Sequence, residues 1–237
     1  MSFEFTRPEP FPPIIKNLII INALVFLAQV VLDSQYQITE HLALYPIDTP
    51  DFKPYQIATH MFAHSPQMIF HILFNMLTLW MFGRVLENYW GGKRFLFFYL
   101  ICGVGAAACH LLVQHLQFDR ALMNELYEAY LIDDQATLNR LSSRADFLAP
   151  AVGASGAIMG VMAAFAYTFP NTELFIMFIP FPVKAKWAVI GLACIDLFGG
   201  VTSVGGDDIA HFAHLGGALT GFLLVLYWNK TNRQSLY

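Results

Sequence analysis

The sequence predicts an all-α protein that crosses a membrane several times. Hydrophobic residues make up 57% of its 237 residues and charged residues 13%, whereas soluble domains carry about 45–50% apolar and about 25% charged residues. The apolar residues are gathered in blocks, and a helix of about 20 residues crosses the roughly 30 Å hydrocarbon core of a bilayer. No hydrophilic stretch is long enough to fold alone. We therefore expect a single membrane-embedded domain over residues 1–237, with its core at 14–228.

Six apolar blocks predict six transmembrane helices, at residues 14–32, 67–85, 95–116, 148–169, 185–198 and 209–228. The segment MSFEFTRPEPFPP before the first block has prolines and acids where a signal peptide has basic residues, so we expect this block to stay in the protein. Pro180 and Pro182 interrupt the apolar run that precedes the fifth block. We expect this interrupted run to lie at the membrane interface.

Two long loops, at residues 33–66 and 117–147, are expected outside the cytoplasm. The second loop has apolar residues at helical spacing, which predicts short helices lying on the membrane or on the protein. Nine Lys and Arg residues lie on the side that holds both termini, and four lie on the opposite side. Because basic loops stay in the cytoplasm, both termini are expected there. The membrane is expected to be the plasma (inner) membrane of a bacterium.

Composition gives little information on partners. The net charge is −4 and no cluster of Lys and Arg is present, so a nucleic-acid partner is not expected. The three cysteines all lie in apolar blocks, where they are expected to be buried thiols rather than a disulfide framework. The lipid bilayer is the one partner that the composition predicts directly. The sequence does not predict an oligomeric state.

Polar side chains inside a bilayer are costly, so each one is a candidate functional group. The predicted helices contain His71, Asn75, Ser155, Asp196, His211 and His214. The second, fourth and sixth helices all run inward from the outer face, so residues equally far from their starts lie at the same depth. Ser155 and His214 each lie roughly 9 Å deep at 1.5 Å per residue, and His71 and Asn75 lie roughly 8–14 Å deep.

This shared depth pairs a hydroxyl with an imidazole. Serine is a weak nucleophile until a base within hydrogen-bond reach takes its proton, so Ser155 is the predicted nucleophile and His214 the general base and acid. An acyl-transfer intermediate also needs hydrogen-bond donors for its oxyanion. His71 and Asn75 lie four residues apart on one helix face. They are predicted to act as these donors, together with the backbone N–H of Ser155.

Small residues predict that the fourth and sixth helices pack closely, because small-xxx-small faces let membrane helices approach each other. Without this approach the short side chain of Ser155 does not reach His214. The packing residues are expected to be Gly153, Gly156, Gly160, Gly217 and Gly221.

Three motifs make the sequence resemble the rhomboid family of intramembrane serine proteases. Gly153-Ala154-Ser155-Gly156 matches the G-x-S-G motif, residues 213–221 (AHLGGALTG) match A-H-x-x-G-x-x-x-G, and residues 71–75 match the H-x-x-x-N of the second helix. Tyr55-Gln56 stands where some members have Trp-Arg, and the loop at 117–147 is long for the family. Similarity covers residues 14–228 and is weakest in that loop.

The resemblance implies a six-helix rhomboid-like bundle that acts as a serine endopeptidase. A Ser155–His214 dyad would hydrolyse peptide bonds in or near the transmembrane segments of membrane-protein substrates. His71, Asn75 and the Ser155 N–H would form the oxyanion hole. The family needs no cofactor and no metal, so none is expected here.

Several alternatives stay open. His211 competes with His214 for the role of base, and Asp196 either tunes the dyad or braces the fifth helix. Glu87 is expected in a structural ion pair. The eight histidines also fit a haem- or metal-binding electron carrier with His71 and His214 as ligands, which a visible absorption spectrum would reveal. A transporter or an inactive binding protein is a third class, and the intact Ser155 and His214 disfavour the inactive form.

Overall fold

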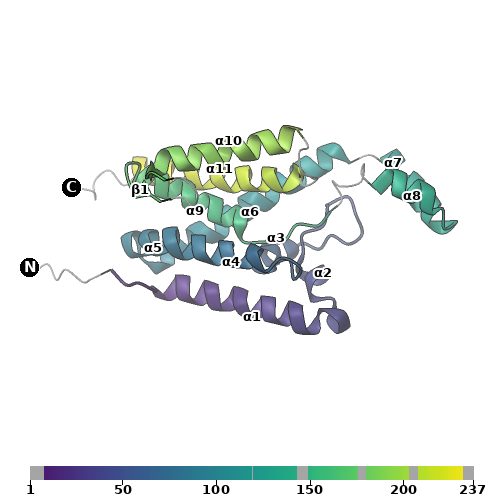
Figure 1. Cartoon of the computed structure of the whole chain (residues 1–237), viewed down its shortest axis with the longest axis horizontal. Helices are drawn as coiled ribbons and strands as arrows, with labels where there is room; N and C mark the ends of the chain where they lie inside the picture. Colours follow the sequence, from purple (N-terminus) through teal and green to yellow (C-terminus); the bar gives the residue numbers. More distant parts are fainter. Residues whose placement is uncertain (1–7, 119, 143–148, 176–179, 203–207, 232–237) are drawn as a thin grey trace, which may run out of the picture.

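The computed structural model describes residues 8–118, 120–142, 149–175, 180–202 and 208–231. Its described residues are mostly helical, with one antiparallel pair of two-residue strands, β1 (Glu173–Leu174) and β2 (Val183–Lys184). The long helices lie along the long axis of the molecule, and α7 (Arg120–Leu131) and α8 (Gln135–Ser142) extend beyond one end (Figure 1). The all-α fold predicted from the sequence is confirmed.

The helices of the bundle are α1 (Pro13–Tyr36), α4 (Ile69–Thr78), α5 (Arg84–Trp90), α6 (Gly92–Gln117), α9 (Ser155–Thr168), α10 (Ala185–Thr202) and α11 (Asp208–Thr231). A π-helical turn, Leu79–Gly83, joins α4 to α5, so these two form one continuous rod. The first long loop contains α2 (Ile38–Leu42), α3 (Gln56–Thr59) and a 3₁₀ turn, His60–Phe62.

In the described part of the chain, four helices are long and apolar enough to cross a membrane: Pro13–Tyr36, Ile69–Trp90, Gly92–Gln117 and His211–Thr231. They match the first, second, third and sixth predicted helices. The fourth predicted helix is α9, whose 14 residues reach only about 21 Å at 1.5 Å per residue. The fifth is α10, which has 18 residues and is not among the four. The predicted count of six spans is therefore not confirmed.

The outer faces of the bundle are apolar, as a lipid environment requires. Leu24, Phe74 and Leu223 are each more than half exposed. Exposed apolar faces of this kind are unfavourable in water, whereas lipid tails cover them and leave the helical backbone bonds intact. Near one end of the bundle, Arg84 lies over the ring of Trp80 and Arg94 over that of Trp228, and such pairs are common where helices leave the bilayer.

The second long loop forms two helices, α7 (Arg120–Leu131) and α8 (Gln135–Ser142). They pack on each other through Leu122 and Leu141 and extend away from the bundle (Figure 1). The short helices predicted for this loop are therefore present, but their predicted placement on the membrane or on the protein is not confirmed. Pro180 and Pro182 lie next to residues 176–179, which are outside the described part of the chain. Val183, just after them, pairs with Leu174.

Glycines bring α9 and α11 into backbone contact. A Cβ atom on Gly217 would collide with the carbonyl oxygen of Gly156, and a Cβ on Gly221 would lie 2.5 Å from the carbonyl oxygen of Gly160. α6 closes the third side, since a Cβ on Gly160 would also lie 2.5 Å from Cys102 Sγ. Helices α6, α9 and α11 thus form the tightly packed centre of the bundle.

Among the described residues, Glu87 does not form the ion pair that the sequence predicts. Its two carboxylate oxygens accept hydrogen bonds from the backbone N–H groups of Ile14 and Ile15, at 2.9 and 2.8 Å. These N–H groups lie in the first turn of α1 and have no acceptors inside the helix. The helix dipole also favours negative charge at this end. Glu87 therefore caps α1 and ties it to α5.

Candidate active site

Ser155 is the first residue of α9, so the predicted start of this helix near residue 148 is wrong for residues 149–154. Two contacts hold those residues in an extended path. Ala151 pairs with Leu44 through two backbone bonds of 2.9 Å, and the N–H of Gly153 donates to the carbonyl of His60 at 2.9 Å. Gly153 has a φ of +131°, a conformation that side chains rarely allow. The helix can therefore begin only after this turn.

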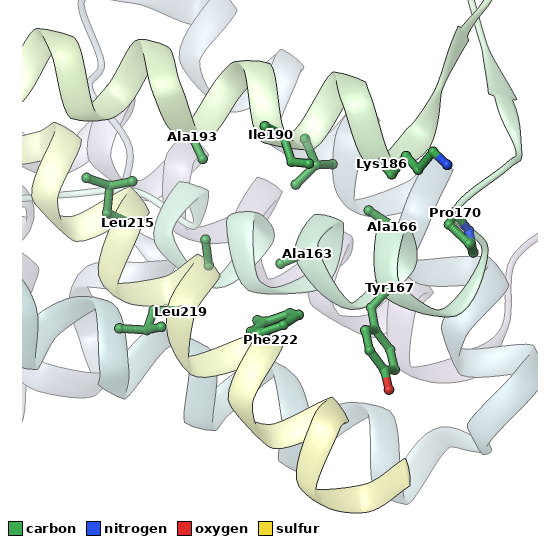
Figure 2. A pocket seen from close by; sticks show the side chains of 12 residues that line it. Ala163, Ala166, Tyr167, Pro170, Lys186, Ile190, Ala193, Leu215, Leu219 and Phe222 are labelled. Atoms are coloured by element: carbon green, nitrogen blue, oxygen red, sulfur yellow. The ribbon is translucent and has the colours of Figure 1, made fainter.

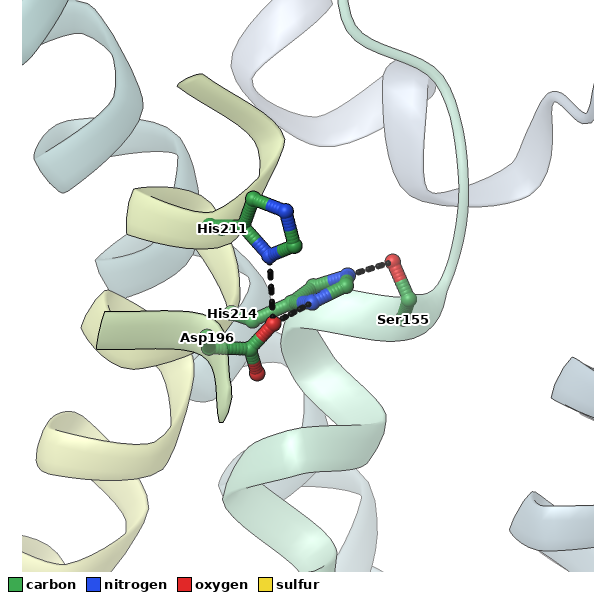
Figure 3. A network of polar contacts seen from close by, with 4 residues as sticks. All are labelled: Ser155, Asp196, His211 and His214. Carbon is green, nitrogen blue, oxygen red and sulfur yellow. Dashed lines mark hydrogen bonds and ion pairs between the residues drawn. The ribbon is translucent and has the colours of Figure 1, made fainter. Parts of the chain in front are cut away.

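His214 reaches Ser155 across the α9–α11 contact. Its Nε2 atom lies 2.8 Å from Ser155 Oγ, within hydrogen-bond distance (Figure 3). Figure 3 also shows that the imidazole lies between Ser155 on one side and Asp196 on the other. The structure thus brings together the two residues that the sequence predicts as nucleophile and base.

Asp196, on α10, completes a three-residue chain. One of its carboxylate oxygens, Oδ1, lies 3.1 Å from Nδ1 of His214 and 2.8 Å from Nδ1 of His211. The Asp196 side chain is mostly buried, where a carboxylate needs hydrogen-bond donors. The sequence left the role of Asp196 open, and its signal was an acidic residue inside an apolar helix. His211 contacts Asp196 and not Ser155 in the described structure.

His71 borders the same site from α4. A Cβ atom on Gly153 would lie 2.8 Å from His71 Nε2 and 3.6 Å from Ser155 Oγ, so both groups face the backbone of Gly153. The ring of His64 packs edge-on behind His71, with centroids 5.1 Å apart. Burial and the proximity of His71 lower the pKa of His64 to about 4. His64 is therefore a neutral ring at pH 7 and supports His71 without adding charge.

Asn75 lies one turn further along α4 and is buried. Its side-chain N–H₂ group has no hydrogen-bond acceptor among the described residues, which is costly for a buried donor. No hydrogen bond joins Asn75 to Ser155 in that part of the chain. Asn75 is therefore a buried amide donor on the helix that carries His71.

The N-terminus of α9 adds backbone donors. The first intrahelical bond runs from the N–H of Ile158 to the carbonyl of Ala154, at 3.0 Å. The N–H groups of Ser155, Gly156 and Ala157 therefore have no acceptor inside the helix. Together with the helix dipole, these groups favour negative charge beside Ser155 Oγ.

An apolar cavity of about 520 Å³ lies among α9, α10 and α11. Figure 2 shows its lining side chains, with Ala163, Ile190 and Phe222 facing the space and Lys186 at one end. Ser155, Asp196 and His214 do not line it. The lining of the cavity therefore does not include the polar site, and its polar side chains are Tyr167 and Lys186.

A domain model described as the rhomboid domain matches residues 51–230. The chain is 29% identical over 168 residues to "Rhomboid protein 1, mitochondrial" of Saccharomyces cerevisiae, which covers 71% of this chain and 40% of that protein. It is 29% identical over 226 residues to the human "Presenilin-associated rhomboid-like protein, mitochondrial", which covers 94% of this chain and 51% of that protein.

"RHOMBOID-like protein 12, mitochondrial" of Arabidopsis thaliana is 27% identical over 208 residues, covering 86% of this chain and 55% of that protein. The chain spans about half the length of the curated relatives it matches. These relatives are mitochondrial by name, so the comparisons give no support to a bacterial plasma membrane. The domain match over most of the chain, the helical membrane fold and these relatives agree: the chain belongs to the rhomboid family, whose members are in general intramembrane proteases.

Proposed function

We propose that this protein is an intramembrane serine endopeptidase with Ser155 as nucleophile and His214 as general base and acid. Its substrates are membrane proteins, which it cleaves in or near their transmembrane segments. The observation that carries the proposal is the 2.8 Å distance between Ser155 Oγ and His214 Nε2 across two closely packed helices. A hydroxyl is activated for attack when a base within this distance takes its proton.

The reaction follows from this geometry. Ser155 Oγ attacks the substrate carbonyl carbon while its proton passes to His214 Nε2, which gives a tetrahedral intermediate. His214 then donates the proton to the leaving nitrogen, the peptide bond breaks, and an acyl-enzyme remains. Water attacks the acyl carbon with His214 again as base, which releases the second product and restores Ser155.

The oxyanion of the intermediate is stabilised by donors from two helices. The N–H of Ser155 belongs to the free N-terminal groups of α9. Asn75 supplies a buried amide without another acceptor among the described residues, and His71 borders the Gly153 backbone. Donors fixed before the reaction stabilise developing negative charge without reorganising.

Labelling with a fluorophosphonate tests this proposal. The reagent phosphonylates an activated serine and places negative charge in the same oxyanion hole, so we expect it to label Ser155 of the detergent-solubilised protein. Asn75→Ala should slow labelling by about 10²–10³-fold, the usual effect of one lost donor. Mass spectrometry identifies the labelled residue, and Ser155→Ala is the control. Labelling elsewhere, or none, contradicts the proposal. An unchanged rate in Asn75→Ala removes Asn75 from the hole.

Asp196 is proposed as the residue that orients the base. Its carboxylate accepts the Nδ1–H of His214, which leaves Nε2 unprotonated and facing Ser155 Oγ. A carboxylate in this position also stabilises the imidazolium that forms when His214 takes the serine proton. Asp196 therefore acts through His214 without touching the substrate.

Asp196→Asn should lower kcat by at least about 10²-fold with little change in KM, because the side chain keeps its size but loses its charge. Asp196→Glu should restore part of the activity, because it returns the carboxylate that His214 bonds to. A merely structural Asp196 would instead lower the unfolding midpoint and would not give a loss confined to kcat.

We also propose that residues 1–237 act as one membrane-embedded domain with both termini in the cytoplasm. The start of α1 and the end of α11 lie at the same end of the bundle (Figure 1), and the excess of basic residues on that side supports the orientation. Protease protection of a C-terminal tag in sealed vesicles tests this, since digestion from the side opposite the cytoplasm would contradict it.

A further inference from the structure

We infer that Asp196, His211 and His214 form a binding site for Zn²⁺ whose occupation switches the protease off. The inference rests on the proposed function, because it concerns a group proposed there as the base. Each of the three residues offers one ligand atom, and these atoms all lie within 4.8 Å of one another. Two imidazoles and one carboxylate are a common ligand set of protein-bound zinc.

Two of the three distances between the ligand atoms are close to those that a zinc ion requires. Ligand atoms about 2.0–2.2 Å from a tetrahedral Zn²⁺ lie about 3.3 Å from each other. Nδ1 of His211 and Nδ1 of His214 lie 2.8 and 3.1 Å from Asp196 Oδ1. Both histidines already direct these nitrogens at the carboxylate (Figure 3). An ion that replaces the two Nδ1 protons moves each nitrogen a few tenths of an ångström from Asp196 Oδ1, and all three ligand atoms lie within 4.8 Å of one another.

The site is rigid on one side and open on the other. A Cβ atom on Gly199 would lie 2.6 Å from His211 Nε2, so the His211 ring packs against the α10 backbone. The Asp196 side chain is 11% exposed, whereas those of His211 and His214 are 29% and 28% exposed. Water therefore reaches the histidines, and a fourth ligand of the ion can be a water molecule, as in open zinc sites.

Occupation of this site removes the base. A neutral imidazole has one proton and one lone pair, on different nitrogens. When zinc takes the lone pair of His214 Nδ1, the proton from Nδ1 passes to water and Nε2 gains one. The protonated Nε2 then donates toward Ser155 Oγ and cannot accept its proton. Asp196 is also engaged by the metal and no longer fixes the active tautomer. Zinc thus blocks the nucleophile without covering it.

The ligand chemistry selects zinc over the abundant hard cations. Imidazole nitrogens suit Zn²⁺, whereas Mg²⁺ and Ca²⁺ prefer shells made mostly of oxygen. The site supplies only one carboxylate, which is too few oxygens for those ions. Inhibition should therefore follow free Zn²⁺ and be insensitive to Mg²⁺.

Proteolysis measured against buffered free Zn²⁺ tests the inference. Wild-type protein should lose activity in a saturable way that a chelator reverses. His211→Gln keeps an N–H donor for Asp196 but is a poor zinc ligand, so its half-inhibitory Zn²⁺ concentration should rise by at least about 10-fold. His115→Gln is the matched control, because His115 pairs with Asp48 at 2.8 Å on the exposed surface, and its Zn²⁺ response should equal that of wild type. Equal inhibition of wild type and His211→Gln overturns the inference.

Binding is measured separately in Ser155→Ala, which has no activity to lose. Co²⁺ takes the place of Zn²⁺ and gives visible absorption bands when four-coordinate. We expect these bands in Ser155→Ala, their loss in Ser155→Ala/His211→Gln, and their displacement by Zn²⁺. Identical spectra in the two variants, or no bands in either, overturn the site. Specific Co²⁺ binding in a protein whose wild type cleaves nothing would keep the metal site and contradict the proposed function alone.

Discussion

Ser155→Ala and His214→Ala are each expected to abolish cleavage of a model transmembrane substrate, with losses on the order of 10⁶-fold. The first change removes the attacking oxygen, and the second removes the atom that lies 2.8 Å from it and takes its proton. Because the two side chains act as one unit, the double variant should be no worse than either single variant. Cleavage is measured by gel or by a fluorogenic substrate in detergent.

His211→Ala is the matched control for this experiment. His211 lies one turn from His214 on the same helix but contacts Asp196 rather than Ser155 (Figure 3), so it should retain substantial activity. Thermal unfolding of each variant verifies that it is folded. An inactive His211→Ala alongside an active His214→Ala would show that the base has been assigned to the wrong histidine.

Gly217→Val is expected to reduce both stability and activity. The new side chain would collide with the carbonyl oxygen of Gly156, so α11 must move away from α9. Overpacking of this kind typically costs about 1–3 kcal/mol. The movement also draws His214 from Ser155, and a 1 Å displacement costs on the order of 100-fold in rate. The unfolding midpoint in detergent and kcat measure the two effects.

Gly191→Val is the matched control, because Gly191 lies on a neighbouring helix and a Cβ there meets nothing within 4 Å. It should keep stability and activity close to those of wild type. If Gly191→Val loses as much stability and activity as Gly217→Val, the loss comes from placing valine in a membrane helix and not from the α9–α11 contact. A Gly217→Val variant with nearly wild-type stability and kcat would show that the close contact of α9 and α11 does not set the Ser155–His214 geometry.

The sequence predicted features that depend on local pattern. Apolar blocks of helical length predicted the all-α membrane fold, and the motifs around Ser155 and His214 predicted the rhomboid family; both are confirmed. The pairing of these two residues was predicted from their depth, with α9 assumed to begin near residue 148. Because α9 begins at Ser155, the helical rise counted from residue 148 does not apply to this residue, although the structure does place its hydroxyl beside His214.

The contacts made by acidic side chains depended on packing that no local pattern reveals. Asp196 bonds to His214 because α10 lies beside α11 with this face turned inward, and the apolar residues around Asp196 do not specify that rotation. Glu87 lies far along the chain from the N–H groups of Ile14 and Ile15 that it caps. Both partners come from other helices, so spacing within one helix cannot identify them.

The backbone pairing of Leu44 with Ala151 and of His60 with Gly153 has an evolutionary consequence. These bonds use main-chain atoms, so the identities of the side chains at residues 44 and 151 are free to drift as long as their packing is maintained. His60 also uses its side chain, whose Nδ1 lies 2.9 Å from the carbonyl oxygen of Gln56. The length of the loop between residues 44 and 60 is constrained instead. Proline is also excluded at residues 44, 151 and 153, because it has no N–H to donate. Selection on the position of the nucleophile thus acts on the geometry of a distant loop, and related chains can diverge widely there while Ser155 stays in place.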